Sequence, residues 1–227
     1  MKYPAHTSMQ FDSELMTVCN DVLRMSAIVE NQFRTALSTV MTIDAAAIQQ
    51  VLNEGQRVNA MEIEIDERCA HILVQRQPTA NDLRLVSAII KTINDLERIG
   101  DESENIARQS QILSTKCHTN LPCCHQIKYM AEVAVGMLGA AIQAFDALDS
   151  EAARKVGRKD TLIDDEFRSV LRHLVAYMME DSNELTTTLQ IAFIARAIER
   201  VGEHAKNISE YVIYMIEGRE SRNFSTI

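Results

Sequence analysis

Hydrophobic residues recur at helical spacing along nearly the whole chain. One example is the row formed by Ile163, Phe167, Val170, Leu174 and Tyr177. Apolar residues at this spacing share one face of a helix, and the alternation that indicates strands is not found. Ala, Leu, Ile, Met, Glu, Gln and Arg dominate the composition, whereas Gly, Pro and Trp are sparse, and this too favours helices. The pattern predicts an all-α chain.

The helical pattern is interrupted by a few short breaks. Asp44 and Asp149 are good N-caps for the runs that follow them. Pro78 disfavours helical backbone at the residue before it, and Gly218 marks a C-terminal stop. Short connections make sequential helices antiparallel. Six helices are predicted, at residues 8–41, 44–76, 80–114, 122–148, 151–181 and 184–217.

Two short cassettes occur twice in the chain. The sequence ERIGDESENI at 97–106 returns as ERVGEHAKNI at 199–208, on the third helix of each half. The segments EIEID at 62–66 and DTLID at 160–164 both place one acid four residues before another, on the middle helix of each half. Such recurrence indicates a duplicated supersecondary unit. We therefore predict a tandem repeat of two antiparallel three-helix bundles, with residues 1–116 and 117–227 as the repeats.

The charge balance narrows the classes of partner. The chain has 23 Lys and Arg against 32 Asp and Glu, a net charge of −9. Nucleic acids and anionic lipid surfaces both select cationic proteins, so binding to either by charge alone is not expected. No signal peptide or membrane-spanning run is found. Five cysteines without an export signal indicate reduced thiols and a cytoplasmic protein.

The recurring acids form pairs spaced four residues apart. Residues at this spacing lie on one helix face, about 5–6 Å apart at Cβ, and like charges there destabilise a bare helix. Several of these acids continue an apolar row, so they need partners. The pairs are Glu62 with Asp66, Glu97 with Asp101, Asp160 with Asp164, and Glu199 with Glu203.

Two interpretations of the acid pairs stay open. Rows of oxygen ligands on neighbouring helices make a site for a hard cation, and iron or manganese also accepts carboxylate ligands. The other interpretation is a solvated helix surface, with Arg98 and Arg200 neutralising the neighbouring acids. Gly100 and Gly202, inside the cassettes, are interpreted as points of close helix packing.

The segment CHTNLPCCH at 117–125 offers soft ligands for zinc. Its spacing matches no standard zinc finger, and adjacent cysteines rarely bind one metal together. We interpret its thiols as exposed or half-buried residues of the linker between the repeats.

The motifs together resemble those of the PhoU family of bacterial phosphate-signalling regulators. The matching segments are MEIEIDERC, QRQPTANDLRLV, KTINDLERIGDESENI, YMMEDS and ARAIERVGEHAKNISEYV, which extend through both halves. The resemblance implies two three-helix bundles, commonly in a homodimer. It also implies metal clusters, of Fe, Zn, Mn or Mg, at the paired carboxylates Glu62, Asp66, Glu97 and Asp101, and Asp160, Asp164, Glu199 and Glu203. The second repeat departs from the motif at Glu203, where Asp is expected.

The resemblance implies a function as well. Members of this family are negative regulators of the phosphate-starvation regulon. They couple the phosphate ABC transporter, through its ATPase subunit, to a membrane histidine kinase, and they restrain phosphate uptake. The expected location is the cytoplasm, with recruitment to the inner membrane through these partners.

The sequence bears on three classes of function. A regulatory adaptor needs no catalytic constellation, and no P-loop, nucleophile elbow, kinase or protease signature is found. A di-iron carboxylate bundle needs Glu-x-x-His on two helices, and no Glu is followed by His at that spacing. A metal store or structural dimer without a signalling role stays as the alternative. The sequence favours the adaptor, which is not an enzyme.

Overall fold

The computed structural model describes residues 9–42, 44–114, 122–180 and 184–218. These residues form helices and contain no strand, which confirms the predicted all-α fold. The helices are α1 (Met9–Met41), α2 (Ala45–Arg76), α3 (Ala80–Ser114), α4 (Cys124–Ala147), α5 (Ser150–Gly157), α6 (Asp160–Glu180) and α7 (Leu185–Glu217).

Local signals in the sequence fix several helix ends. The carboxylate of Asp44 accepts a hydrogen bond from the backbone N–H of Ala46 at 2.8 Å. Asp149 does the same for Ala152 at 2.9 Å. Gly218 ends α7 with a φ of 68°, in the left-handed region that glycine enters without a Cβ penalty. These predicted caps are confirmed.

The predicted helix 151–181 was wrong in one respect, because it is two helices. α5 ends at Gly157, and a turn follows in which Lys159 N–H donates to the carbonyl of Val156 at 3.0 Å. Glycine lowers helix propensity at this point, and Arg158 and Lys159 add no apolar residue to hold the helix on the core. As a result, Asp160 becomes the first residue of α6.

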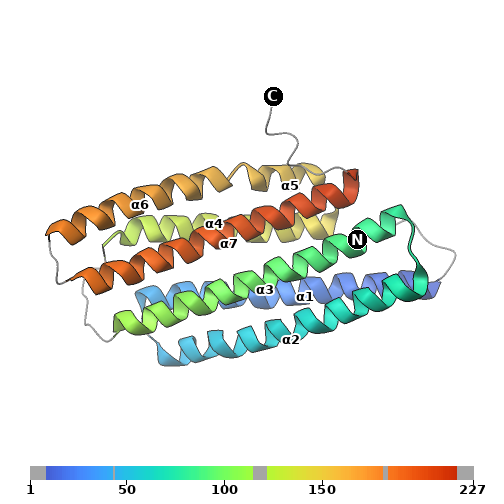
Figure 1. The fold of residues 1–227 in the computed structure, drawn as a ribbon, viewed down its shortest axis with the longest axis horizontal. Helices are drawn as coiled ribbons and strands as arrows, with labels where there is room; N and C mark the ends of the chain where they lie inside the picture. The colour runs from blue at the N-terminus through green and yellow to red at the C-terminus, as the bar shows by residue number, and fades with distance from the viewer. Residues whose placement is uncertain (1–8, 43, 115–121, 181–183, 219–227) are drawn as a thin grey trace.

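The helices are arranged in two layers (Figure 1). The nearer layer has the order α6, α7, α3, α2, and α4 and α1 lie behind it. Within the first repeat α1, α2 and α3 all pack on one another, and in the second α4, α5 and α6 all pack on α7. The most extensive contact joins α3 to α7, the two helices that carry the repeated cassettes. These two helices run antiparallel, so the cassettes meet at the centre of the molecule.

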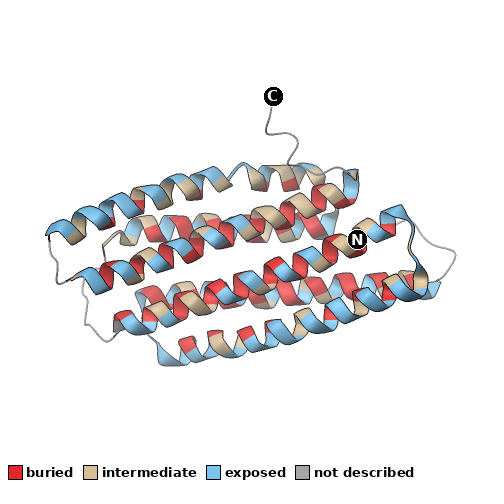
Figure 2. Ribbon diagram, in the orientation of Figure 1, coloured by how far each residue is buried: buried red, intermediate tan, exposed pale blue. Residues whose placement is uncertain are grey.

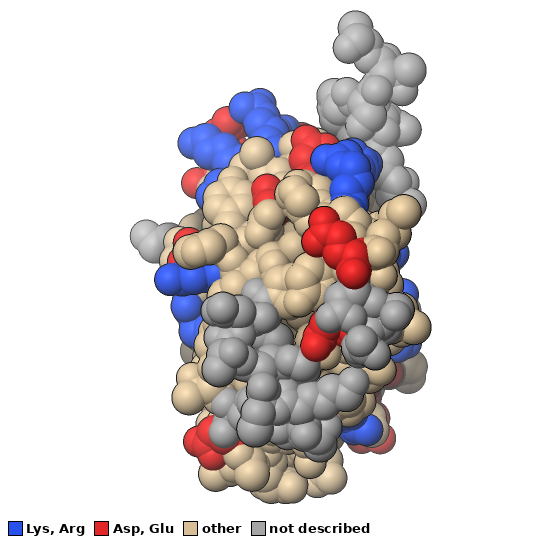
Figure 3. Space-filling model, turned by 90° about the vertical axis from the view of Figure 1, so that its left-hand side faces the viewer, with Lys and Arg blue, Asp and Glu red and all other residues tan. Residues whose placement is uncertain are grey.

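Burial follows the layered arrangement. Figure 2 shows mostly exposed residues on α6 and α2, at the two edges of the nearer layer, and more buried residues on the helices between them. Figure 3 looks onto the end of the molecule at which α6 ends and α7 begins, where other helices end as well. The surface at its centre carries few charged side chains.

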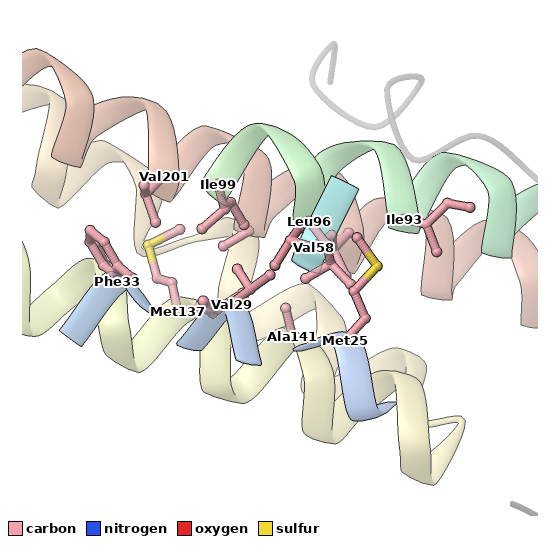
Figure 4. Close-up of a cluster of buried hydrophobic side chains, with 14 of the residues drawn as sticks. Met25, Val29, Phe33, Val58, Ile93, Leu96, Ile99, Met137, Ala141 and Val201 are labelled. Carbon is pink, nitrogen blue, oxygen red and sulfur yellow. The ribbon is translucent and has the colours of Figure 1, made fainter. Parts of the chain in front are cut away.

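The two repeats share one hydrophobic core. Figure 4 shows Met25, Val29 and Phe33 of α1 gathered with Leu96 and Ile99 of α3. Met137 and Ala141 of α4 and Val201 of α7 join the same cluster from the second repeat. Apolar burial contributes about 25 cal/mol per Å², so this core stabilises the pairing of the repeats as well as each bundle.

α4 is the most apolar of the long helices. In the described part of the chain it alone has the length and mean hydropathy that could suit a membrane span. The core helix of a folded bundle passes the same test, and Met130, Met137, Leu138 and Phe145 of α4 are fully buried here.

Candidate functional site

The four acid pairs lie on the four helices of one layer. Glu62 and Asp66 are on α2, Glu97 and Asp101 on α3, and the second set is on α6 and α7. None of these eight side chains is fully buried. Since α2 packs on α3 and α6 packs on α7, each repeat brings its own two pairs to one helix–helix junction.

In the first repeat three of the four acids interact. The pKa of Glu97 is raised, first by burial of its carboxyl and then by the charge of Asp101; Glu62 on α2 adds to the effect. The Arg98 guanidinium lowers the Glu97 pKa in part, because its nitrogens lie 3.4 Å from a Glu97 oxygen and 3.7 Å from an Asp101 oxygen. Asp66 is exposed and acts on the Cys69 thiol, whose pKa burial raises to about 12.

In the second repeat all four acids interact. Burial raises the pKa of Glu199, and Glu203, Asp164 and Asp160 raise it further, while Arg196 lowers it. The Arg196 guanidinium lies 2.8 Å from Glu199. Lys206 donates to Asp160 at 2.6 Å, and this hydrogen bond raises the lysine pKa.

The fit of a metal ion can be judged from these contacts. Glu199 Oε2 is buried without a hydrogen-bond partner, and an unpaired carboxylate oxygen of this kind suits a cation. Against this, no three His, Cys, Asp or Glu side chains among the described residues are gathered closely enough to hold an ion together. Asp160 is held by Lys206, which a metal would have to displace. The donor types in the second repeat therefore suit a hard cation, but the side-chain positions do not form a finished site.

The cassette glycines allow close helix packing, as the sequence indicates. A Cβ on Gly202 would lie 2.6 Å from Cδ1 of Ile163 on α6. A Cβ on Gly100 would lie 3.2 Å from Oε1 of Gln32 on α1. The Gln32 amide, which is fully buried, donates to the carbonyl of Val51 at 3.0 Å.

A polar row between α3 and α7 is the feature that sequence reasoning missed. Arg200 was predicted to neutralise its neighbouring acids; the charges of Glu199 and Glu203 do act on it, but its guanidinium also reaches across to Glu102 of the other repeat at 2.7 Å. His204 Nδ1 lies 2.6 Å from Asp95, and the Asn207 amide donates to Asp95 at 3.3 Å. Asp95 and Glu102 are both buried.

A signal for this row was present in the sequence. Asp95 falls between Ile93 and Leu96 on the apolar face of its helix. A buried carboxylate needs a partner, and the partners lie on the repeat that packs against it.

Part of the linker segment lies outside the described residues, including Cys117 and His118. Cys123 and Cys124 are half-buried, as predicted for linker thiols, and Cys124 Sγ lies 3.5 Å from the sulfur of Met41. His125 is exposed.

Comparison with known proteins adds to this geometry. The family model for the PhoU domain matches residues 22–110 and 127–212, one segment on each side of the predicted boundary. A PhoU homolog of Burkholderia sp., described as a phosphate-specific transport system accessory protein, is 40% identical over 97% of this chain and 94% of its own length. The Escherichia coli K12 accessory protein PhoU is 36% identical over 96% of this chain and 90% of its own length.

Two solved structures of PhoU proteins have the same fold as this chain. The crystal structure of PhoU from Pseudomonas aeruginosa has a TM-score of 0.89 and 38% identity, and the match covers 92% of this chain and all of that one. The phosphate transport system regulatory protein PhoU from Streptococcus pneumoniae has a TM-score of 0.84 and 25% identity, and the match covers 92% of this chain and 98% of that one. The duplicated bundle, its acidic cassettes and these matches together show that the chain belongs to the PhoU family.

Proposed function

We propose that this protein is an accessory regulator of phosphate transport and a negative regulator of the phosphate-starvation regulon. The observation that carries the proposal is the match to accessory proteins of the phosphate-specific transport system across both repeats. Its proposed partners are the ATPase subunit of the phosphate ABC transporter and the phosphate-sensing histidine kinase. It acts on them by binding, as a homodimer without catalysis, in the cytoplasm or at the inner membrane where they reside.

Deleting the gene tests this function. Alkaline phosphatase activity is read in phosphate-rich medium in the deletion strain, in the parent and in the deletion strain carrying the wild-type gene. High activity despite ample phosphate, returned to the parental level by the gene, supports negative regulation. Activity that stays at the parental level in the deletion strain refutes it.

A second proposal concerns the acid pairs, which we infer bind a metal cation in the second repeat. The unpartnered Glu199 Oε2 and the three acids around it favour this, because a cation relieves both the repulsion and the unmet hydrogen-bonding need. Metal content is measured by mass spectrometry on purified protein, in the wild type and in Glu199→Gln with Asp164→Asn. Equal metal content in folded protein would refute the site.

The first repeat supplies the matched variant, Glu97→Gln with Asp66→Asn. It removes the same charges from a junction where Glu62 is the one acid of α2 that acts on Glu97. We expect a smaller loss of metal in this variant than in the second repeat. An equal or larger loss would show that both junctions bind metal alike and would refute the assignment to the second repeat.

A further inference from the structure

Two sulfur atoms meet where the first repeat approaches the second. Met41 is the last residue of α1, and Cys124 is the first residue of α4. The two residues are 83 positions apart in the chain, yet Cys124 Sγ lies 3.5 Å from Met41 Sδ. Figure 1 shows α1 ending and α4 beginning at the same end of the molecule. The sulfur contact therefore joins the two repeats at this end.

Both residues line a cavity of about 740 Å³ between α1 and α4. Most of the remaining lining is apolar and includes Leu37, Val40 and Ile127. Met41 is 50% exposed, and Cys124 is half-buried. An ion from solvent can therefore reach both sulfur atoms.

The contact between the two sulfur atoms leaves their metal-binding capacity unused. A thiol is a weak hydrogen-bond donor and a thioether is a weak acceptor, so the contact holds the two side chains only weakly. Among the described residues neither sulfur has another hydrogen-bond partner. A metal ion that binds both would displace only this one weak contact.

The adjacent Cys123 has different surroundings. Its side chain packs against the hydrophobic core. Burial raises the pKa of its thiol, and the charge of Glu166 raises it further. Because a metal binds the thiolate, a raised pKa makes Cys123 a poor ligand. Cys123 is therefore a natural control for Cys124.

The types of donor atom select the class of metal. Thiolate and thioether sulfur are soft ligands that favour Cu(I), and imidazole also suits copper. His125 lines the same cavity and offers an imidazole. A structural zinc site needs four ligands, and no three His, Cys, Asp or Glu side chains in the described ranges lie close enough to hold an ion together. The donors therefore suit a soft monovalent cation better than zinc.

The separation of the sulfur atoms is close to that of a three-coordinate site. Metal–sulfur bonds of about 2.3 Å, at angles of about 120°, place two sulfur ligands about 4.0 Å apart. From the observed 3.5 Å, Met41 Sδ has to move by about 0.5 Å. Methionine has three rotatable bonds, and Met41 is half exposed at the end of its helix, so this movement requires no change in the backbone.

We propose that Met41, Cys124 and His125 bind Cu(I) in the cavity between α1 and α4. The Cys124 thiol releases its proton to solvent when the metal binds, and copper remains Cu(I), so the step needs no oxidant or reductant. The bound ion links the end of α1 to the start of α4 and stabilises the pairing of the repeats. This site is separate from the acid pairs, whose carboxylates suit hard cations.

A competition assay with Cu(I) tests the site. The purified protein is titrated with Cu(I) under nitrogen in the presence of ascorbate, against the coloured chelator bathocuproine disulfonate. We expect the affinity to fall at least about tenfold in Met41→Leu and further in Cys124→Ser, because even changes to groups that only support a ligand cost about 10–100-fold. His125→Asn should also weaken binding. None of the three side chains is fully buried, so each variant should keep its helical circular dichroism.

Two variants serve as matched controls. Cys123→Ser removes the adjacent thiol, and Glu199→Gln with Asp164→Asn removes hard ligands from the second repeat. Both should bind Cu(I) as tightly as the wild type. X-ray absorption at the copper edge should show sulfur neighbours in the wild-type complex, and Cu(I) should raise the melting temperature of the wild type more than that of Cys124→Ser.

Several results would overturn the proposal. An affinity for Cu(I) that is unchanged in Cys124→Ser or in Met41→Leu would show that the sulfur pair is not a site. An equal loss in Cys123→Ser would show that Cu(I) binds thiols of this segment without selection. Copper with only nitrogen and oxygen neighbours would exclude both sulfur ligands, and an unchanged affinity in His125→Asn would remove the imidazole from the site.

Discussion

Removing the Arg200 side chain tests whether the ion pair between the repeats stabilises the fold. Arg200 donates to Glu102 at 2.7 Å, and this hydrogen bond raises the pKa of the guanidinium. After Arg200→Ala the Glu102 carboxylate, which is only 11% exposed, still accepts a hydrogen bond from the Asn105 amide at 3.4 Å. Arg98 occupies the same position in the first cassette and provides the matched control, Arg98→Ala.

The expected loss of stability on Arg200→Ala depends on how far the two charged side chains of the ion pair are exposed to solvent. A hydrogen bond to a charged group contributes about 1.5–3 kcal/mol. Arg200 is 52% exposed, so solvent screening places the cost of Arg200→Ala at about 1–2 kcal/mol. Arg98 is 60% exposed with longer contacts, so Arg98→Ala should cost less than about 0.5 kcal/mol. A loss of about 1 kcal/mol lowers the melting temperature of a chain of this length by roughly 2–4 °C.

The assay is urea unfolding followed by circular dichroism, with a double-mutant cycle that adds Glu102→Gln. The cycle should give a coupling energy of about 1 kcal/mol between Arg200 and Glu102, since the residues are in direct contact. If the coupling energy is near zero, or if Arg98→Ala costs as much as Arg200→Ala, the ion pair does not stabilise the pairing of the repeats.

Four further variants change single positions. Burial, and then Asp101, raises the pKa of Glu97, so the folded state binds its proton more tightly and this group lowers stability as pH rises through the folded pKa. Glu97→Gln should therefore raise the free energy of unfolding at pH 7 by about 0.2–0.5 kcal/mol through relieved repulsion, seen as a higher melting temperature, and change nothing well below the ordinary pKa of 4.5; a pH-independent effect would contradict this. Gly139 has open space around its Cβ position, so Gly139→Ala should stabilise by about 1 kcal/mol in urea unfolding. The Cβ that Gly202→Ala adds meets Ile163, so the free energy of unfolding of this variant should be at least about 1 kcal/mol lower than that of Gly139→Ala; equal free energies would show that α6 and α7 are loosely packed. Gln32 Oε1 is buried without a partner, so Gln32→Met should raise the free energy of unfolding by up to about 1 kcal/mol, and a clear loss would show that its amide bonds outweigh the unpaired oxygen.

Local signals predicted most of the helices, because helix ends depend on nearby residues. The caps at Asp44, Asp149 and Gly218 act within one turn, so they can be identified without a structure. The break after Gly157 was missed because an isolated glycine inside a helical pattern is tolerated and does not by itself end the helix.

The sequence predicts which acids share a helix face, but it does not predict which side chains from other helices contact them. Spacing of four residues places Glu199 and Glu203 on one face whatever the fold. Whether Lys206 would hold Asp160, and whether Arg200 would turn toward Glu102, depends on contacts between helices far apart in sequence. Such contacts follow from how the repeats pack, which helical periodicity does not specify.

The antiparallel contact of α3 with α7 bears on how such a chain evolved. In a homodimer of one repeat, a twofold axis would impose every contact twice, so an Arg at the position of Arg200 would face the position of Glu102 on both sides. Fusion of two copies removes that constraint. Here the contact is formed once, by Arg200 with Glu102. In the other half of the interface, the position of Glu102 is occupied by His204, which pairs with Asp95, and Arg98 is released to serve the acids of its own helix. Gene fusion thus lets the halves of a once symmetric interface acquire separate tasks.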